Sequence, residues 1–308
     1  MFDNKQLCRA VVDNRHALEP IATDVQPELK VLPGVRAVIF DIYGTLVVSG
    51  SGDVGSANEK DPDKRDPSEQ MADAFAAIGV FPPVLEIPTY GQRLRDIIHS
   101  ANDARRNADC PHPEVDIVAI WRQMLVAVGL HGFANDTLRV VQLAAQYESR
   151  ANPTWPMPGA KGLLSQLRES EMSMGIVSNA QQFTLPLVAD LGDGSGPSGD
   201  LASVGFNLNL CFFSNRFRQS KPGPRLFDGL IRGLKRMSIQ PSEAVYVGND
   251  MLNDVYAASQ AGLRTAWFAG DVRSCRPRSE NPLCQTLKAD VVLTQLTQLR
   301  NCLAIESP

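Results

Sequence analysis

The sequence predicts an α/β fold in which a doubly wound parallel sheet carries an inserted all-helical block. Short apolar runs with a bias towards β-branched residues recur along the chain, and each ends at small or polar residues. Segments with helical spacing separate these runs, which is typical of strand–helix alternation around a parallel sheet. One stretch, from 67 to 147, shows helical spacing only.

The first predicted strand lies at 35–40 and follows an N-terminal extension of mixed polarity, residues 1–34. The run is apolar, stops at Asp41 and turns at Gly44, as a buried strand of a parallel sheet does. Two polar stretches after this strand are expected to be solvated loops, at 49–52 and at 59–66.

The stretch from 67 to 147 predicts a helical module inserted after the first strand. Apolar residues recur three and four positions apart, as in Leu94, Ile97 and Ile98. Helices are expected near 69–79, 90–106, 114–128 and 135–149. With its flanking loops, the module is assigned to residues 49–155.

Strand–helix alternation resumes after the proline-rich segment 152–159. Strands are expected at 172–177, 210–213, 244–247, 264–268 and 290–293, and helices at 160–170, 224–236, 254–261 and after the last strand. The region 182–208 is expected to be irregular, with an exposed loop around 192–199. Because ligands bind at the carboxyl edge of such sheets, the residues that follow the strands are the candidates for a site.

The composition is that of an average soluble globular protein. The 308 residues are 44% hydrophobic and 21% charged, and the net charge is −4. No basic excess argues for nucleic acid or an anionic membrane surface, and no apolar run approaches the ~18–20 residues that span a bilayer. The N-terminus does not read as a signal peptide, and the cysteines show no metal or disulfide pattern. A cytoplasmic protein is therefore expected.

Two candidate site segments directly follow predicted strands. The first is Asp41-Ile42-Tyr43-Gly44-Thr45-Leu46, in which rigid backbone positions a carboxylate and Gly44 permits a sharp turn and the approach of a ligand. The second is Ser178-Asn179, where a hydroxyl and adjacent backbone N–H groups can hold the oxygens of an anion.

Two further segments carry charge. Lys221 precedes Pro222, and its ammonium group can neutralise a nearby anion. The segment from Gly248 to Asp254 presents Asn249, Asp250 and Asp254 at a strand-to-helix turn, and hard oxygen ligands of this kind suit Mg²⁺. Each segment alone is commonly a turn or a helix cap. Their order and context together indicate a site.

This ordered set resembles the four motifs of the haloacid dehalogenase (HAD) superfamily, which are a strand-end Asp, a strand-end Ser or Thr, a Lys and an acidic pair. The resemblance covers roughly residues 36–293, and Met157-Pro158-Gly159 resembles the return from the cap in subfamily I members. It implies a Rossmann-like core at 35–48 and 156–308, with the helical module as an all-helical, C1-type cap.

The resemblance also implies roles for single residues. Asp41 would attack the substrate and form a covalent aspartyl ester or aspartyl phosphate, while Ser178 would bind a substrate oxygen and Lys221 would offset charge. Mg²⁺ would be held by Asp41, the backbone carbonyl of Tyr43 and the acidic motif. Gly44, Thr45 and Asn179 are expected to contact the substrate.

Two positions depart from the family's pattern. Tyr43 stands where phosphatases of the family carry a second Asp that protonates the leaving group. A tyrosine can donate a proton, but Tyr here resembles the 2-haloacid dehalogenases, whose halide needs none. The acidic motif reads Gly-Asn-Asp. Either Asn249 occupies the usual ligand position and leaves Asp250 to coordinate, or Asp250 and Asp254 form the pair.

Three functions follow from these observations. The first is a Mg²⁺-dependent phosphatase that acts on a small phosphate ester through phospho-Asp41. The alternatives are a metal-independent 2-haloacid dehalogenase and a non-catalytic protein that binds phosphate and metal. A dehalogenase needs a cationic cap residue, for which Arg93, Arg95 and Arg122 are candidates by position. The expected partner is a small molecule, with no nucleic acid and no membrane, and the oligomeric state is not indicated.

Overall fold

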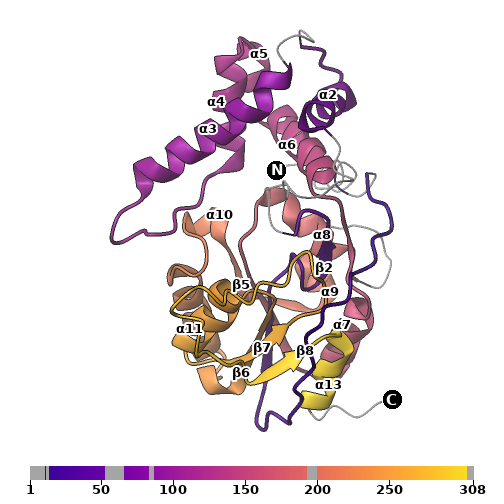
Figure 1. Ribbon diagram of the computed structural model, residues 1–308, viewed down its shortest axis with the longest axis vertical. Helices are drawn as coiled ribbons and strands as arrows, with labels where there is room; N and C mark the ends of the chain where they lie inside the picture. The colour runs from indigo at the N-terminus through magenta and orange to yellow at the C-terminus, as the bar shows by residue number, and fades with distance from the viewer. Residues whose placement is uncertain (1–10, 12–13, 53–65, 83–86, 193–199, 304–308) are drawn as a thin grey trace.

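The computed structural model describes residues 11, 14–52, 66–82, 87–192 and 200–303. Figure 1 shows two regions in this part of the chain. A group of helices, α2 to α6, lies at one end of the molecule, and a sheet with its own flanking helices lies at the other. The predicted α/β class with a helical insertion is confirmed.

The described strands of the larger sheet are all parallel, in the order β5-β4-β1-β6-β7-β8. Their bounds are β1 Ala37–Phe40, β4 Ser173–Ser178, β5 Phe206–Phe213, β6 Ala244–Gly248, β7 Arg264–Phe268 and β8 Val291–Leu293. Strand β1 is central, and Ala37 is in register with Ser173 of β4 and Ala244 of β6. The residues that follow these three strands therefore meet at one edge of the sheet.

Helices cover both faces of this sheet. Alternate side chains of β1 point to opposite faces, so β1 contributes to two apolar clusters. Val38 and Phe40 pack in one cluster with the apolar side of α7 (Ala160–Glu169). Ala37 and Ile39 pack in a second cluster with α11 (Arg225–Arg236). Each fully buried aliphatic side chain stabilises the fold by roughly 1.5–3 kcal/mol. The predicted doubly wound arrangement is confirmed.

The inserted region is helical, as expected. Its helices are α2 Pro67–Ala77, α3 Ile87–Arg105, α4 Ile117–Ala127, α5 His131–Ala134 and α6 Thr137–Ala151. Aspartates start three of them, since the side chains of Asp66, Asp116 and Asp136 accept hydrogen bonds from backbone N–H groups in the first turns of α2, α4 and α6. The ring of Trp121 lies edge-on to Tyr147 at a centroid distance of 5.4 Å, which joins α4 to α6.

Two short strands connect the helical region to the core. Strand β2 (Val47–Ser49) pairs antiparallel with β3 (Thr154–Pro156). The prediction of a solvated loop at 49–52 was wrong, because Ser49, Ser51 and Gly52 are buried. Asn152 is the reason: its side-chain oxygen accepts hydrogen bonds from the Ser49 hydroxyl at 2.9 Å and the Ser51 N–H at 3.1 Å. Most of the charged run at 59–66 lies outside the described residues.

The prediction of irregular structure at 182–208 was also wrong in part. Apolar side chains of this region join the core, among them Leu187, Val188, Leu201 and Val204. They belong to α8 (Leu185–Ala189) and α9 (Leu201–Val204), and β5 begins at Phe206, earlier than expected. Residues 193–199 of the predicted loop lie outside the described part.

Short elements complete the described part of the core. They are η1 Gln182–Thr184, α10 Ser214–Phe217, η2 Pro241–Glu243, η3 Met251–Tyr256, α12 Ala257–Gln260, η4 Leu296–Gln298 and α13 Leu299–Cys302. The helix predicted at 254–261 starts earlier, at Met251, with a π-helical segment. No helix in the described ranges has both the length and the apolar character needed to cross a membrane.

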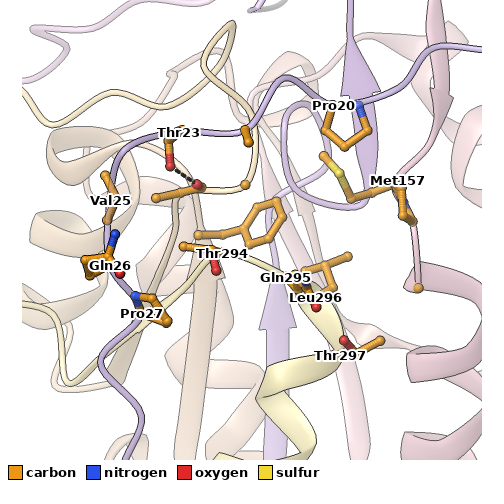
Figure 2. Close-up of a pocket in the computed structure, with 16 residues that line it drawn as sticks. Pro20, Thr23, Val25, Gln26, Pro27, Met157, Thr294, Gln295, Leu296 and Thr297 are labelled. Carbon is orange, nitrogen blue, oxygen red and sulfur yellow. Dashed lines mark hydrogen bonds between the residues drawn. The ribbon is translucent and has the colours of Figure 1, made fainter.

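Part of the N-terminal extension lies along the core. Glu28 forms an antiparallel bridge with Val292, and the Thr23 hydroxyl donates a hydrogen bond to the carbonyl of Ala269 at 2.7 Å. A cavity of about 610 Å³ lies between this segment and the turn that starts with Thr294. Figure 2 shows its neutral lining, with Thr23, Gln26 and Pro27 facing Thr294, Gln295 and Thr297.

Candidate active site

Asp41 lies at the carboxyl end of β1, at the centre of the sheet edge. Its backbone N–H donates a 2.9 Å hydrogen bond to the carbonyl of Val247, which fixes the residue against β6. The side chain faces a cleft and is 11% exposed. The described residues that line this cleft, called the Asp41 cleft below, are Asp41, Tyr43, Gly52, Asn179, Lys221, Asn249, Asp250, Asn253, Asp254 and Arg276.

Lys221 joins two carboxylates of the cleft. Its ammonium group donates hydrogen bonds to Asp41 Oδ1 at 2.8 Å and to Asp254 Oδ1 at 2.6 Å, and it is almost fully buried. Burial alone lowers the pKa of a lysine, but the charges of Asp254 and Asp41 outweigh burial and raise the pKa of Lys221. Lys221 is therefore a fixed positive charge beside Asp41. No described residue donates a hydrogen bond to the second oxygen, Asp41 Oδ2.

Neighbouring groups hold Lys221 in place. The side-chain oxygen of Asn179 accepts a 2.7 Å hydrogen bond from the Lys221 backbone N–H. The phenol oxygen of Tyr246 accepts from the ammonium group at 2.9 Å and donates to the Val177 carbonyl at 2.6 Å. The predicted residues Asn179 and Lys221 thus lie in one cleft with Asp41, although they belong to separate segments of the chain.

Ser178 lies at the end of β4 and is fully buried. Its hydroxyl donates to the Asn179 carbonyl at 3.4 Å, which is a long hydrogen bond. Ser178 is the last residue of β4, which pairs with β1, but it does not belong to the described lining of the cleft.

Gly44 and Thr45 form the turn after Asp41. Gly44 has a φ of +73°, and a Cβ there would lie 2.3 Å from Ser274 Cβ, so only glycine fits. The Thr45 hydroxyl is buried and donates to Asn249 Oδ1 at 3.4 Å. Neither residue is in the described cleft lining, and Thr45 joins the turn to the loop that follows β6.

The phenol of Tyr43 is hydrogen-bonded away from the carboxylates. Its hydroxyl lies 3.0 Å from Thr184 Oγ1, and the ring is buried. Burial, followed by the negative charge of Glu148, raises the pKa of Tyr43 well above its ordinary value of 10.0. The hydroxyl is therefore a weaker acid than a free tyrosine.

The three polar side chains of the acidic motif, Asn249, Asp250 and Asp254, have different partners. Asp250 forms an ion pair with Arg278 at 2.6 Å and accepts hydrogen bonds from the N–H groups of Leu252 and Asn253. Asp254 binds Lys221, and burial raises the pKa of its carboxyl group against the opposing charge of that lysine. Asn249 donates to the Ser274 carbonyl at 2.6 Å and lines the cleft.

The oxygen donors around Asp41 fit a Mg²⁺ site in which few of the ligands are protein carboxylates. In the described chain, no three His, Cys, Asp or Glu side chains converge as a metal site. The Asp41 carboxylate, the Asn249 amide and Tyr43 nevertheless share the cleft, and Mg²⁺ is commonly bound through one or two carboxylates with waters and substrate phosphate. Asp250 and Asp254 each form an ion pair with a cation, whereas the side-chain oxygen of Asn249 accepts a long hydrogen bond from Thr45.

Arginines on the loop after β7 were missed by sequence reasoning. Arg276 lines the cleft, and Arg278 binds Asp250. The spacing of Arg273, Arg276 and Arg278 after a predicted strand was a visible signal for a cationic loop. The cap arginines behave differently: Arg93 and Arg95 are exposed on α3, and Arg122 donates to Thr137.

Comparison with known proteins agrees with this fold. The family model for haloacid dehalogenase-like hydrolases matches residues 35–262. The chain therefore belongs to the haloacid dehalogenase-like hydrolase family.

Two curated relatives are both named glyceraldehyde 3-phosphate phosphatase. A glyceraldehyde 3-phosphate phosphatase of Pyrococcus furiosus is 33% identical over 154 residues, which cover 49% of this chain and 55% of the relative. One from Pyrococcus abyssi is 26% identical over 115 residues, covering 36% and 42%. The chain thus spans about half the length of the curated relatives that it matches.

Solved structures resemble this chain at low identity, and one of them reaches a TM-score of 0.50. A defluorinating L-2-haloacid dehalogenase has 21% identity and a TM-score of 0.50, with 90% of this chain and 99% of the other covered. A HAD phosphatase from Thermococcus onnurineus has 20% identity and a TM-score of 0.48, with 88% and 99% covered.

Proposed function

We propose that this hydrolase is a phosphatase that hydrolyses a small phosphate ester through a covalent aspartyl phosphate on Asp41. The observation that carries the proposal is the pairing of Asp41 with a buried lysine at the carboxyl edge of the sheet. One carboxylate oxygen is oriented by Lys221, and the other has no hydrogen bond from the described residues. A carboxylate held in this way has a free oxygen for attack.

The proposed reaction has two steps. Asp41 Oδ2 attacks phosphorus, the bond from phosphorus to the leaving oxygen breaks, and the leaving alkoxide takes a proton from a solvent water. Water then attacks the aspartyl phosphate, which releases phosphate and restores the carboxylate. Lys221 offsets negative charge on the transferring group, and Asn179 keeps the lysine segment in position.

We assign the Mg²⁺ site to the Asp41 carboxylate, the backbone carbonyl of Tyr43 and the side-chain oxygen of Asn249. When bound, Mg²⁺ would stabilise the negative charge that develops on the phosphoryl group. The ion pair of Asp250 with Arg278 supports this choice, because that carboxylate already has a cation.

The curated relatives support a small phosphate ester as the substrate class. Both are phosphatases of glyceraldehyde 3-phosphate by name, but they match this chain over about half of their length. The free thiols of the described chain support a cytoplasmic location, since reduced cysteines persist in a reducing compartment.

A panel of phosphate esters, assayed for released phosphate with Mg²⁺ and with EDTA, tests the proposal. We expect turnover that needs Mg²⁺ and that falls by about 10⁴-fold or more in Asp41→Asn, which keeps the shape of the side chain but removes the nucleophile. The exposed Asp96→Asn is a matched control. Full activity in Asp41→Asn would refute the aspartyl-phosphate route.

A second candidate function is 2-haloacid dehalogenation. The position of Tyr43 favours it, because a buried phenol bonded to Thr184 supplies no accessible proton donor, and halide needs none. Halide release from 2-chloropropionate that persists in EDTA would support this function. Binding of Mg²⁺ and phosphate without turnover of either substrate class would instead indicate a non-catalytic protein.

A further inference from the structure

The loop after β7 carries three arginines with different partners. Arg273 forms an ion pair with Asp271 at 3.0 Å, and Arg278 forms one with Asp250 at 2.6 Å. Arg276, between them, forms no ion pair with any described residue. The charge of Arg276 is therefore not compensated by a neighbouring carboxylate of the described chain.

The hydrogen bonds of Arg276 all go to backbone carbonyls. Its Nη1 donates to the carbonyls of Arg273 at 2.7 Å and Cys275 at 3.2 Å, and its Nη2 donates to that of Gly52 at 3.1 Å. A guanidinium group has five N–H donors. The Nε–H and one Nη2–H thus have no partner among the described residues, and the side chain is only half-buried. Paired N–H groups of this kind bind carboxylate and phosphate oxygens well.

The backbone of Arg276 is fixed to the site. Its N–H donates to the Asn249 carbonyl at 3.0 Å, and its carbonyl accepts from the Met251 N–H at 2.9 Å. The side chain lines the Asp41 cleft and reaches Gly52, which belongs to the linker that leads to the helical region. Arg276 therefore lies on the side of the cleft next to Gly52, whereas Lys221 lies beside the nucleophile.

We propose that Arg276 binds a carboxylate on the leaving group of the substrate and so makes the enzyme selective for phosphate esters of hydroxy acids. The inference rests on the proposed phosphatase function and deepens it by naming the substrate class. A neutral leaving group leaves the guanidinium charge unpaired, whereas a carboxylate forms charge-assisted hydrogen bonds with the open N–H groups.

Two substrates that differ in one group test this inference. 3-Phosphoglycerate carries a carboxylate where glyceraldehyde 3-phosphate carries an aldehyde, and the phosphoryl group is the same. We expect the wild-type enzyme to have the higher kcat/KM on 3-phosphoglycerate. Arg276→Gln should lower that preference by about 10- to 100-fold, mainly through KM, because one charge-assisted interaction is lost. Arg276→Lys should retain part of the preference.

Arg273→Gln is the matched control, because this arginine is on the same loop but outside the described cleft lining. It should leave the ratio of the two kcat/KM values unchanged. An equal fall on both substrates in Arg276→Gln would overturn the inference, since that result indicates a role at the phosphoryl group or in holding the linker. A wild-type preference for the aldehyde would overturn it as well.

A binding measurement separates this inference from the proposed function. Calorimetry of 3-phosphoglycerate binding to Asp41→Asn and to the double variant Asp41→Asn/Arg276→Gln needs no turnover. A loss of affinity of about 10-fold or more in the double variant supports the carboxylate role even if no ester is hydrolysed. Equal affinity in the two variants refutes it even if the wild-type enzyme is an active phosphatase.

Discussion

The ammonium group of Lys221 donates a 2.8 Å hydrogen bond to the carboxylate of Asp41, although the residues are 180 positions apart in the chain. The same ammonium group binds Asp254 at 2.6 Å. One buried cation therefore lies between two carboxylates. We expect both the activity and the stability of the protein to depend on Lys221.

Replacing Lys221 by Met should lower both stability and activity. The change leaves two buried carboxylates facing each other, and breaking a buried ion pair in this way costs about 3–5 kcal/mol. Urea unfolding should show this loss in the free energy of unfolding. The double variant Lys221→Met/Asp254→Asn should recover part of the stability but none of the phosphatase activity. Unchanged stability in Lys221→Met would contradict the buried ion-pair arrangement.

Replacing Tyr43 by Phe should affect stability more than catalysis. The phenol hydroxyl is buried against Thr184, so its removal should cost about 1 kcal/mol of unfolding free energy. The value of kcat should stay within about threefold, because general acids contribute about 10²–10⁴-fold and this hydroxyl is not placed as one. A fall in kcat of about 100-fold in steady-state assays would instead identify Tyr43 as the proton donor.

The adjacent residues Asn249 and Asp250 should differ in their effect on Mg²⁺. Asn249→Ala should raise the Mg²⁺ concentration for half-maximal activity by about 10-fold, because it removes a ligand oxygen. Asp250→Asn should change that concentration by less than about threefold, since its carboxylate is bound to Arg278. Mg²⁺ titrations of the two variants make the comparison. The reverse order of effects would assign the ligand to Asp250.

Glu114 should make stability depend on pH. Its carboxylate is hydrogen-bonded to Ser214 at 2.7 Å, and burial raises the pKa of Glu114 above its ordinary value of 4.5. The folded state then binds more protons than the unfolded state, so this group lowers the free energy of unfolding as pH rises from about 4.5 towards the folded pKa.

In Glu114→Gln, which stays neutral, this contribution is absent. The stability of the variant relative to wild type should therefore increase with pH above the ordinary value of 4.5. Urea unfolding of both proteins between about pH 4 and pH 8 measures the difference. A stability difference that is the same at every pH would show that Glu114 has the same pKa in the folded and unfolded states.

Much of the fold and part of the site were predictable from local patterns. The apolar run before Asp41 predicted a buried strand, and the spacing of Leu94, Ile97 and Ile98 predicted a helix; both are present in the structure. Such patterns report burial and backbone geometry, which neighbouring residues determine. They also placed Asp41 and Asn249 directly after predicted strands of a parallel sheet, whose carboxyl ends lie at one edge. The structure shows that these two strands, β1 and β6, are adjacent.

Other features depend on contacts between distant segments. The burial of Ser49 and Ser51 depends on Asn152, about a hundred residues away, and polar composition alone indicated the opposite. The role of Asp250 depends on Arg278, which forms an ion pair with its carboxylate.

The sequence by itself therefore determined the α/β class, the helical insertion and the set of strand-end residues from which a site can be built. Only the tertiary structure decided which of these side chains share the cleft. It also decided that the Tyr43 hydroxyl is bonded to Thr184, and that Arg276 lines the same cleft as Asp41. The physical reason is that periodicity fixes the direction of a side chain relative to its own strand or helix. Hydrogen bonds and ion pairs require distances of about 3 Å between atoms, and the packing of loops against one another sets those distances.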